Sequence, residues 1–185
     1  LAVIVALLRR SNNKAISGVT ATYIYIMRGT PLLLQLMFIF FGFHFVPVIG
    51  YAFSRFQAIY IAFILNYTAY FAEIFRGGIN SIDLGQYEAA KVLGMSKVFT
   101  FIKVILPQVI KNVLPAIGNE VITLVKDTSL VYILGASDIL KAAKSVSNVY
   151  SAFSPYVLIA LVYLAIVAVL TKLLSNIERR YNYYR

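Results

Sequence analysis

The sequence contains no cysteine, no tryptophan and a single histidine, His44. Without cysteine there are no disulfides, thiolate metal sites or cysteine nucleophiles, and one histidine cannot build a histidine-rich metal centre. Charged residues make up only 13% of the 185 residues, whereas a soluble domain has roughly 25%. Apolar residues account for 61%, and the mean hydropathy is +0.81. This composition indicates a membrane protein and excludes disordered chains and ordinary soluble enzyme folds.

Acidic residues are few, at 7 against 17 lysines and arginines, which gives a net charge of +10. In a soluble protein this balance would suggest nucleic-acid binding. In an apolar chain it is better explained by the excess of lysine and arginine that sets membrane orientation. The 14 tyrosines and 13 phenylalanines supply the aromatic belts that membrane proteins place at the two interfaces.

Long uncharged runs locate the membrane spans. A helix needs about 20 apolar residues to cross a bilayer. Residues 31–53 and 145–171 contain no charged residue, and residues 56–75 contain only Glu73. The run 108–130 is less clean. We predict about five spans: a first one cut short at residues 1–8, then 22–44, 55–77, 107–130 and 152–174. The chain is expected to begin part-way through the first helix; the tail of a signal sequence is the alternative.

The basic residues gather in alternate loops, which predicts the orientation. Lysine and arginine are frequent after the first span, after the third span and at the end of the chain, and cytoplasmic loops carry such an excess. The N-terminus is therefore predicted outside and these three regions inside. The residues concerned are Arg9, Arg10, Lys14, Arg76, Lys91, Lys97, Lys103, Arg179, Arg180 and Arg185.

The longest stretch outside the spans, residues 78–106, is not built like a linker. Its first half has helical spacing, with Ser81 or Asp83 as candidate N-caps and Gly94 as a stop. Its second half predicts another short amphipathic helix that ends or kinks at Pro107. Two short cytoplasmic helices suggest a docking surface for a partner, although a structured loop would look the same.

The same stretch carries a spaced motif. Its elements are Glu88-Ala89-Ala90, three residues, Gly94, nine residues, Val104, one residue and Leu106-Pro107. This motif resembles the EAA signature of bacterial ABC importer permeases, with Val104 in place of isoleucine. By that resemblance, Glu88, Ala89, Ala90 and Gly94 form a coupling helix that contacts the ATPase subunits.

Further stretches resemble the polar amino-acid uptake branch of these permeases. They are Arg28-Gly29-Thr30-Pro31-Leu32-Leu33 with Gln35-Leu36, Glu73–Ile79 and Lys126–Leu130. The similarity covers most of residues 15–175. It implies an all-α polytopic membrane protein with the MetI-like permease core, forming a single domain over residues 1–185 with a coupling loop at 78–106. It also implies a bacterial inner-membrane location, a homodimer or a pair with a close relative, two cytoplasmic ATPase subunits and an external amino-acid-binding protein.

The sequence lacks the glycine-rich phosphate loop G-x-x-x-x-G-K-[ST]. The chain is therefore not expected to hydrolyse ATP or to hold a cofactor of its own. ATP and magnesium are expected on the partner ATPase subunits.

Acidic residues inside a predicted span suggest a substrate site, because charges are costly there and are usually functional. Glu120 lies 13 residues beyond Pro107, or ~20 Å along a helix. Thr123 and Asp127 follow at helical spacing on the same face, and Asn119 flanks them. Pro115 and Gly118 are expected to loosen the helix beside a cavity. Two carboxylates suit an ammonium or guanidinium group; a helix–helix salt bridge is the alternative.

A polar cluster in the third span adds Asn66, Tyr67 and Tyr70, and the second span adds Gln35. These side chains line a cavity or act as hydrogen-bonding glue between helices. Glu73 and Arg76, three residues apart, are expected to form an ion pair.

The favoured function is the permease subunit of an ATP-driven importer for polar amino acids. The two acids favour cationic substrates, and neutral polar ones stay open. An ion-coupled secondary transporter or channel, with the acids as ion ligands, is the alternative. An intramembrane enzyme would have to use Glu120 and Asp127 as its catalytic pair, and we expect no catalytic residue and no metal site.

Overall fold

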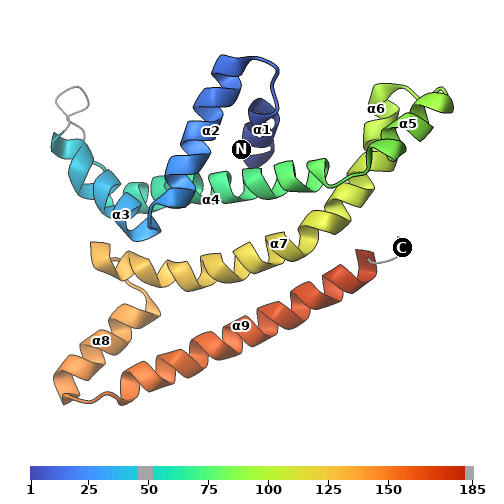
Figure 1. Cartoon of the computed structure of the whole chain (residues 1–185). Coiled ribbons are helices and arrows are strands. Elements are labelled where there is room, and N and C mark those ends of the chain that lie inside the picture. Colours follow the sequence, from blue (N-terminus) through green and yellow to red (C-terminus); the bar gives the residue numbers. More distant parts are fainter. Residues whose placement is uncertain (46–51, 182–185) are drawn as a thin grey trace. The chain divides into compact units, whose positions relative to one another are not determined.

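The computed structural model describes residues 1–45 and 52–181, and every regular element in these ranges is helical (Figure 1). The elements are α1 (Ala2–Arg9), α2 (Lys14–Gly29), α3 (Leu32–Met37), α4 (Arg55–Asn80), α5 (Leu84–Val92), α6 (Lys97–Thr100), α7 (Leu106–Asp127), α8 (Ile139–Tyr150) and α9 (Ser154–Tyr181). A π-helical segment, Phe38–Gly42, and a 3₁₀ turn, Phe43–Phe45, follow α3. A second π segment, Phe101–Ile105, joins α6 to α7, and a 3₁₀ segment, Thr128–Leu134, follows α7.

Within the residues that the structure describes, three helical stretches are long and apolar enough to cross a membrane: Arg55–Asn80, Lys97–Leu134 and Ser154–Arg180. They contain the predicted spans 55–77, 107–130 and 152–174 or nearly all of each. Helix α9 has no buried residue within the chain, so its apolar surface is available to lipid or to a partner.

The predicted span 22–44 is broken by a sharp bend. Helix α2 already begins at Lys14, and the axis turns by 106° between Lys14–Gly29 and Leu32–Gly42. The cause lies at Pro31, which lacks an N–H and disfavours helical conformation in the residue before it. Pro31 is the N-cap residue of α3, which begins at Leu32. Thr30 does not cap it, because its hydroxyl donates to the Ile26 carbonyl at 2.8 Å.

The predicted ends of the coupling helix are confirmed. Asp83 caps α5, and its side chain accepts a hydrogen bond from the Gly85 N–H at 2.6 Å. Gly94 follows the helix with a φ of +71°, and the Met95 N–H closes the turn on the Ala90 carbonyl at 3.0 Å. A positive φ at this position favours glycine.

The second short helix, expected to end or kink at Pro107, is not a separate element. Residues 97–134 form one helical stretch, in which the π segment Phe101–Ile105 leads into α7. Pro107 is the second residue of α7, directly after the π segment, and does not interrupt the stretch. Nor do Pro115 and Gly118 interrupt α7, which runs unbroken from Leu106 to Asp127.

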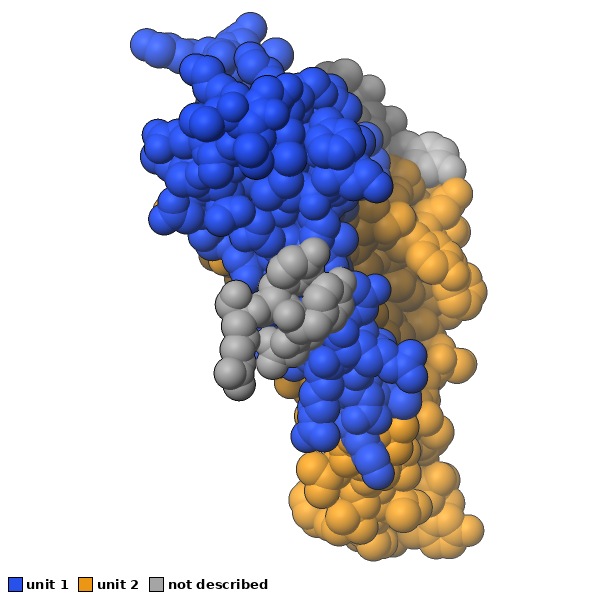
Figure 2. Space-filling view, turned by 90° about the vertical axis from the view of Figure 1, so that its right-hand side faces the viewer, with its two compact units in different colours: residues 1–24, 68–120, 172–185 blue, residues 25–67, 121–171 orange. Residues whose placement is uncertain are grey.

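The chain divides into two compact units, which Figure 2 colours separately. Unit 1 comprises residues 1–24, 68–120 and 172–185, and unit 2 comprises residues 25–67 and 121–171. The prediction of a single domain over the whole chain stays a prediction. Within unit 1, a buried apolar cluster joins the end of α4 to α7 and consists of Ile82, Ile105, Val109 and Val113.

Close packing beside this cluster depends on Gly78. A Cβ atom at Gly78 would lie 2.1 Å from Cγ1 of Val113, whereas a Cβ at the neighbouring Gly77 would meet nothing within 4 Å. The two glycines are adjacent in the same helix, so they differ mainly in what surrounds them. Gly78 allows α4 and α7 to approach.

We therefore expect Gly78→Ala to destabilise the protein by ~1–3 kcal/mol through overpacking. Gly77→Ala should be neutral or stabilising by up to about 1 kcal/mol, because alanine favours helix. Thermal unfolding of the detergent-solubilised protein measures both, and Val113→Ala should rescue Gly78→Ala. Equal melting temperatures for the two alanine variants would contradict this packing.

Candidate functional site

A buried hydrogen-bond network holds the bend between α2 and α3. The Asn66 side chain is 4% exposed and its amide donates to Oε1 of Gln35 at 3.0 Å and to the Met27 carbonyl at 3.1 Å. Nε2 of Gln35 donates to the carbonyls of Met27 and Thr30 at 2.9 and 3.1 Å, and to Oγ1 of Thr30 at 2.7 Å. The two amides thus bind carbonyls at the break, which must be satisfied inside a membrane.

From the sequence, Asn66 and Gln35 could either form hydrogen bonds between helices or line a cavity. The contacts above are hydrogen bonds between helices. Gln35 also borders a cavity of about 490 Å³ whose lining is almost entirely apolar, so it belongs to both descriptions. Sequence reasoning missed Met27 and Thr30 as partners. The available signal was the motif from Arg28 to Leu36, which contains Thr30 and Gln35 together.

Replacing Asn66 by leucine should cost about 1–3 kcal/mol, because the Gln35 oxygen and the Met27 carbonyl lose a buried donor. Gln35→Leu should cost a similar amount. The double variant should cost less than the sum, since the two amides bind each other. Unfolding of the three variants in detergent measures this coupling, and additive losses would show that the two side chains act independently.

The structure brings two predicted site residues from different helices together in unit 2. The Tyr67 hydroxyl donates to Oδ2 of Asp127 at 2.8 Å, and the Tyr67 ring stacks on Phe63 with centroids 6.1 Å apart. Tyr67 is 5% exposed and Asp127 is half-buried. Asp127 ends α7, where the helix dipole places partial negative charge. A carboxylate at this end is suited to a cation.

The other predicted site residues of α4 and α7 are divided between the two units. Thr123 is half-buried in unit 2, one turn of α7 before Asp127. Glu120 is half-buried and Asn119 exposed, at the end of the part of α7 that belongs to unit 1. Tyr70 is half-buried on the part of α4 that belongs to unit 1. Glu73 forms the expected ion pair with Arg76. Among the described residues, no three histidine or carboxylate side chains are grouped as a metal site requires.

The predicted coupling residues lie on an exposed short helix. Glu88, Ala89 and Gly94 are exposed, whereas Ala90 is buried at 3% exposure and anchors α5 to the rest of unit 1. Apolar side chains beside them face outward, with Leu84 74% and Val92 87% exposed. An exposed apolar surface rimmed by charged residues is typical of a protein interface.

The whole chain matches a family model. Residues 1–183 match the family described as "Binding-protein-dependent transport system inner membrane component". The chain therefore belongs to this family of ABC transporter permeases, and the resemblance inferred from the EAA motif is confirmed.

Curated relatives place it among amino-acid permeases. A Rickettsia bellii protein with the provisional name glutamine transport system permease protein GlnP is 38% identical over 181 residues, which are 97% of this chain and 82% of the relative. The Bacillus subtilis arginine transport system permease protein ArtQ is 36% identical over 97% of this chain and 82% of its own. The Agrobacterium fabrum nopaline transport system permease protein NocM is 37% identical over 94% and 76%.

Solved structures agree in fold. A crystal structure of an amino acid ABC transporter with histidines has a TM-score of 0.88 and 40% sequence identity, covering 97% of this chain and 83% of that one. An inward-facing structure of the methionine transporter MetNI has a TM-score of 0.77 at 16% identity, which speaks for the fold alone.

The chain is thus an amino-acid ABC transporter permease subunit with the MetI-like fold, located in the inner membrane. It is not itself an enzyme, since the ATPase of such transporters is a separate subunit. An ATPase subunit and a substrate-binding protein are its partners.

Proposed function

We propose that this chain forms the translocation pathway of an ATP-driven importer that carries polar, cationic L-amino acids into the cytoplasm. The observation that carries the proposal is the acidic stripe on α7. Glu120, Thr123 and Asp127 follow one another at spacings of three and four residues, so they share one face of a helix that spans the membrane.

The stripe has the chemistry to hold an amino acid with two positive groups. An α-ammonium and a side-chain ammonium or guanidinium each form charge-assisted hydrogen bonds with a carboxylate. The Tyr67 hydroxyl fixes Asp127 through Oδ2, and Oδ1 is the oxygen that would receive the substrate. Thr123, Asn119 and Tyr70 would complete the site with neutral hydrogen-bonding groups. Gln35 and Asn66 would contribute by holding the bend between α2 and α3.

The energy for transport would enter through α5. We propose that the exposed surface around Glu88 and Ala89 sits in a groove of a cytoplasmic ATPase subunit, which binds ATP and magnesium. Ala90 ties α5 to unit 1, so movement of the ATPase would be transmitted to the spans. A shift between inward-open and outward-open states requires that this contact differ between ATP-bound and ATP-free partners.

The membrane sides follow from α7. The stretch Lys97–Leu134 is long and apolar enough to cross a membrane. A single crossing would put α5, which precedes it, and α8, which follows it, on opposite sides. The excess of basic residues near α5 would place that helix in the cytoplasm and α8 outside. We propose that two copies of the chain assemble about a two-fold axis, with two ATPase subunits below and the binding protein above.

Uptake by the complex in proteoliposomes tests this function. ATP is enclosed in the proteoliposomes and the binding protein is added outside. Arginine and lysine should enter fastest, glutamine more slowly, and leucine and glutamate most slowly. If the acidic stripe selects the substrate, unlabelled amino acids should inhibit the uptake of labelled arginine in the same order. A preference for glutamate or leucine would contradict the acidic stripe as the substrate site.

A further inference from the structure

Three basic side chains converge on the segment that links α7 to α8 in unit 2. Nζ of Lys141 donates to the Gly135 carbonyl at 2.6 Å, and Nη2 of Arg55 is 3.3 Å from where a Cβ of Gly135 would lie. Nζ of Lys144 is 5.4 Å from the centroid of the Tyr132 ring. We call Arg55, Lys141 and Lys144 the cationic surface. Its two lysines line a cavity of about 450 Å³ with Tyr132, Ser145 and Asn148.

No acid of unit 2 neutralises this surface. The ranges that form the unit contain two acids, Asp127 and Asp138. Asp127 accepts the Tyr67 hydroxyl. Asp138 caps α8, accepting the Lys141 N–H at 2.8 Å through Oδ1, while its Oδ2 is buried. Neither lysine lies in a salt bridge with a described residue, and both are held by contacts to Gly135 and Tyr132. Arg55 and Lys144 are exposed, and Lys141 is half-buried.

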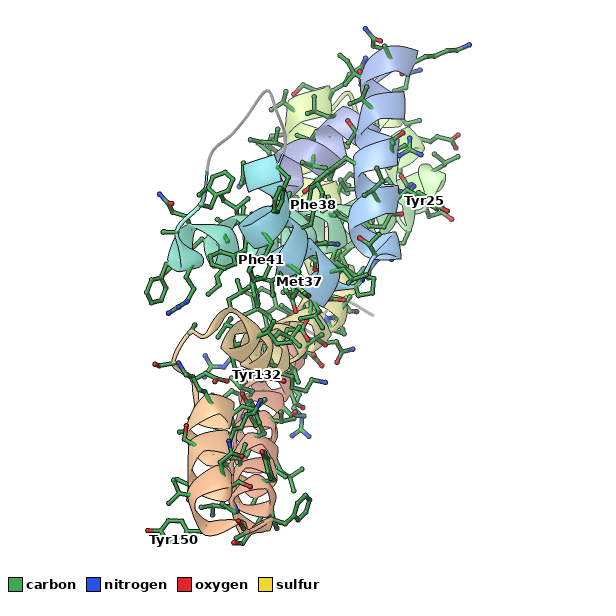
Figure 3. All side chains as sticks on the ribbon, turned by 90° about the vertical axis from the view of Figure 1, so that its left-hand side faces the viewer. Tyr25, Met37, Phe38, Phe41, Tyr132 and Tyr150 are labelled. Atoms are coloured by element: carbon green, nitrogen blue, oxygen red, sulfur yellow. The ribbon has the colours of Figure 1, made fainter. Side chains whose placement is uncertain are left out.

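Exposed apolar side chains lie at the C-terminal end of α8 and just beyond it. Val149, Tyr150 and Phe153 are 76%, 74% and 74% exposed, and Figure 3 shows Tyr150 at the end of α8 away from Tyr132. Aromatic residues and arginine are enriched at protein interfaces. A second copy of this chain fits poorly, because a two-fold contact would place the same positive surface against itself.

We propose that the cationic surface and the adjoining tip of α8 form the docking surface for an acidic face of the external amino-acid-binding protein. This inference rests on the proposed function, which places α8 outside. The partner is chosen by charge complementarity: carboxylates on its surface would pair with Arg55, Lys141 and Lys144, and the apolar tip would be covered at the edge of the contact. Opposite charge of this kind accelerates encounter and fixes orientation.

The test uses the complete transporter in neutral phosphatidylcholine nanodiscs. The probe is the arginine-loaded binding protein that stimulates ATP hydrolysis by the unmodified complex. In Lys141→Glu/Lys144→Glu, the concentration of binding protein for half-maximal stimulation should rise about tenfold or more, with basal hydrolysis unchanged. Lys14→Glu/Lys172→Glu makes the same change of charge on exposed lysines elsewhere and should leave this concentration unchanged.

Cross-linking gives a second readout that does not depend on the folding of the double-glutamate variant. The chain has no cysteine, so Lys144→Cys introduces a single one. A photoactivatable maleimide on it should cross-link to the purified binding protein, and acidic residues should flank the site on the partner. Raising the salt concentration should weaken stimulation of the unmodified complex more than that of the double-glutamate variant.

The outcomes are distinguishable. One outcome is that the binding protein stimulates the unmodified complex and the double-glutamate variant with the same half-maximal concentration. That result would overturn the docking surface and leave the importer function standing. An effect of the variant that appears only when phosphatidylglycerol replaces phosphatidylcholine would assign the surface to lipid and overturn the proposal. An unmodified complex that no binding protein stimulates would overturn both the proposed function and this inference.

Discussion

Replacing Gly94 by valine is expected to abolish coupled amino-acid uptake while leaving ATP hydrolysis by the complex active. Gly94 ends α5 with a φ of +71°, a conformation that costs an L-residue roughly 1–2 kcal/mol and a β-branched one more. Valine should unwind the turn in which the Met95 N–H binds the Ala90 carbonyl. The exposed face of α5 would then no longer be held rigidly against unit 1. Uptake and phosphate release from the same proteoliposomes measure the coupling.

Two matched variants separate conformation from chemistry. Gly94→Asn keeps the side-chain bulk but tolerates a positive φ, so it should retain most uptake. Glu88→Arg reverses an exposed charge without altering the turn, and we expect it to uncouple uptake from hydrolysis, whereas Glu88→Gln should be milder. Normal coupling in both Gly94→Val and Glu88→Arg would rule out α5 as the connection to the ATPase.

The second large effect is expected at the acidic stripe. Glu120→Gln should lower uptake of arginine and lysine by about tenfold or more, because a hydrogen bond to a charged group contributes ~1.5–3 kcal/mol. Glutamine, which has one positive group instead of two, should lose much less. Asp127→Asn should act in the same direction and also weaken the bond with Tyr67. Initial rates of uptake for each amino acid give the comparison.

A control with the same chemistry lies outside the stripe. Glu178→Gln removes an equal charge from α9 and should leave the ratio of arginine to glutamine uptake unchanged. If Glu120→Gln reduces arginine, lysine and glutamine uptake to the same extent, the carboxylate has no selective role.

Local sequence signals were sufficient to predict a helix end where a single residue determines the backbone conformation. Asp83 and Gly94 set the ends of α5, and Pro31 sets the point where α3 begins. A signal of the same kind gave a wrong helix end where the helix could accommodate the residue. Pro107 does not stop the helix, which continues from the π segment Phe101–Ile105 into α7. The direction of the break at Pro31, and hence the 106° bend, was not contained in the hydropathy pattern.

The partners of the polar side chains could not be predicted, since they depend on contacts distant in sequence. Asn66 binds Gln35, 31 residues away, and Tyr67 binds Asp127, 60 residues away. Composition and spacing show that such residues are polar groups within spans, but not which helix each one faces. The cationic surface could not be predicted for the same reason, because Arg55 and Gly135 are distant in the sequence and lie close together only in the folded chain.

The most direct test of the central claim, that this chain moves amino acids with energy from a separate ATPase, is uphill arginine accumulation in proteoliposomes containing the purified complex. We expect accumulation above the external concentration with Mg-ATP on the side of the ATPase subunits, and none with a proton or sodium gradient alone. Accumulation driven by an ion gradient in the absence of ATP and of the ATPase subunits would contradict it.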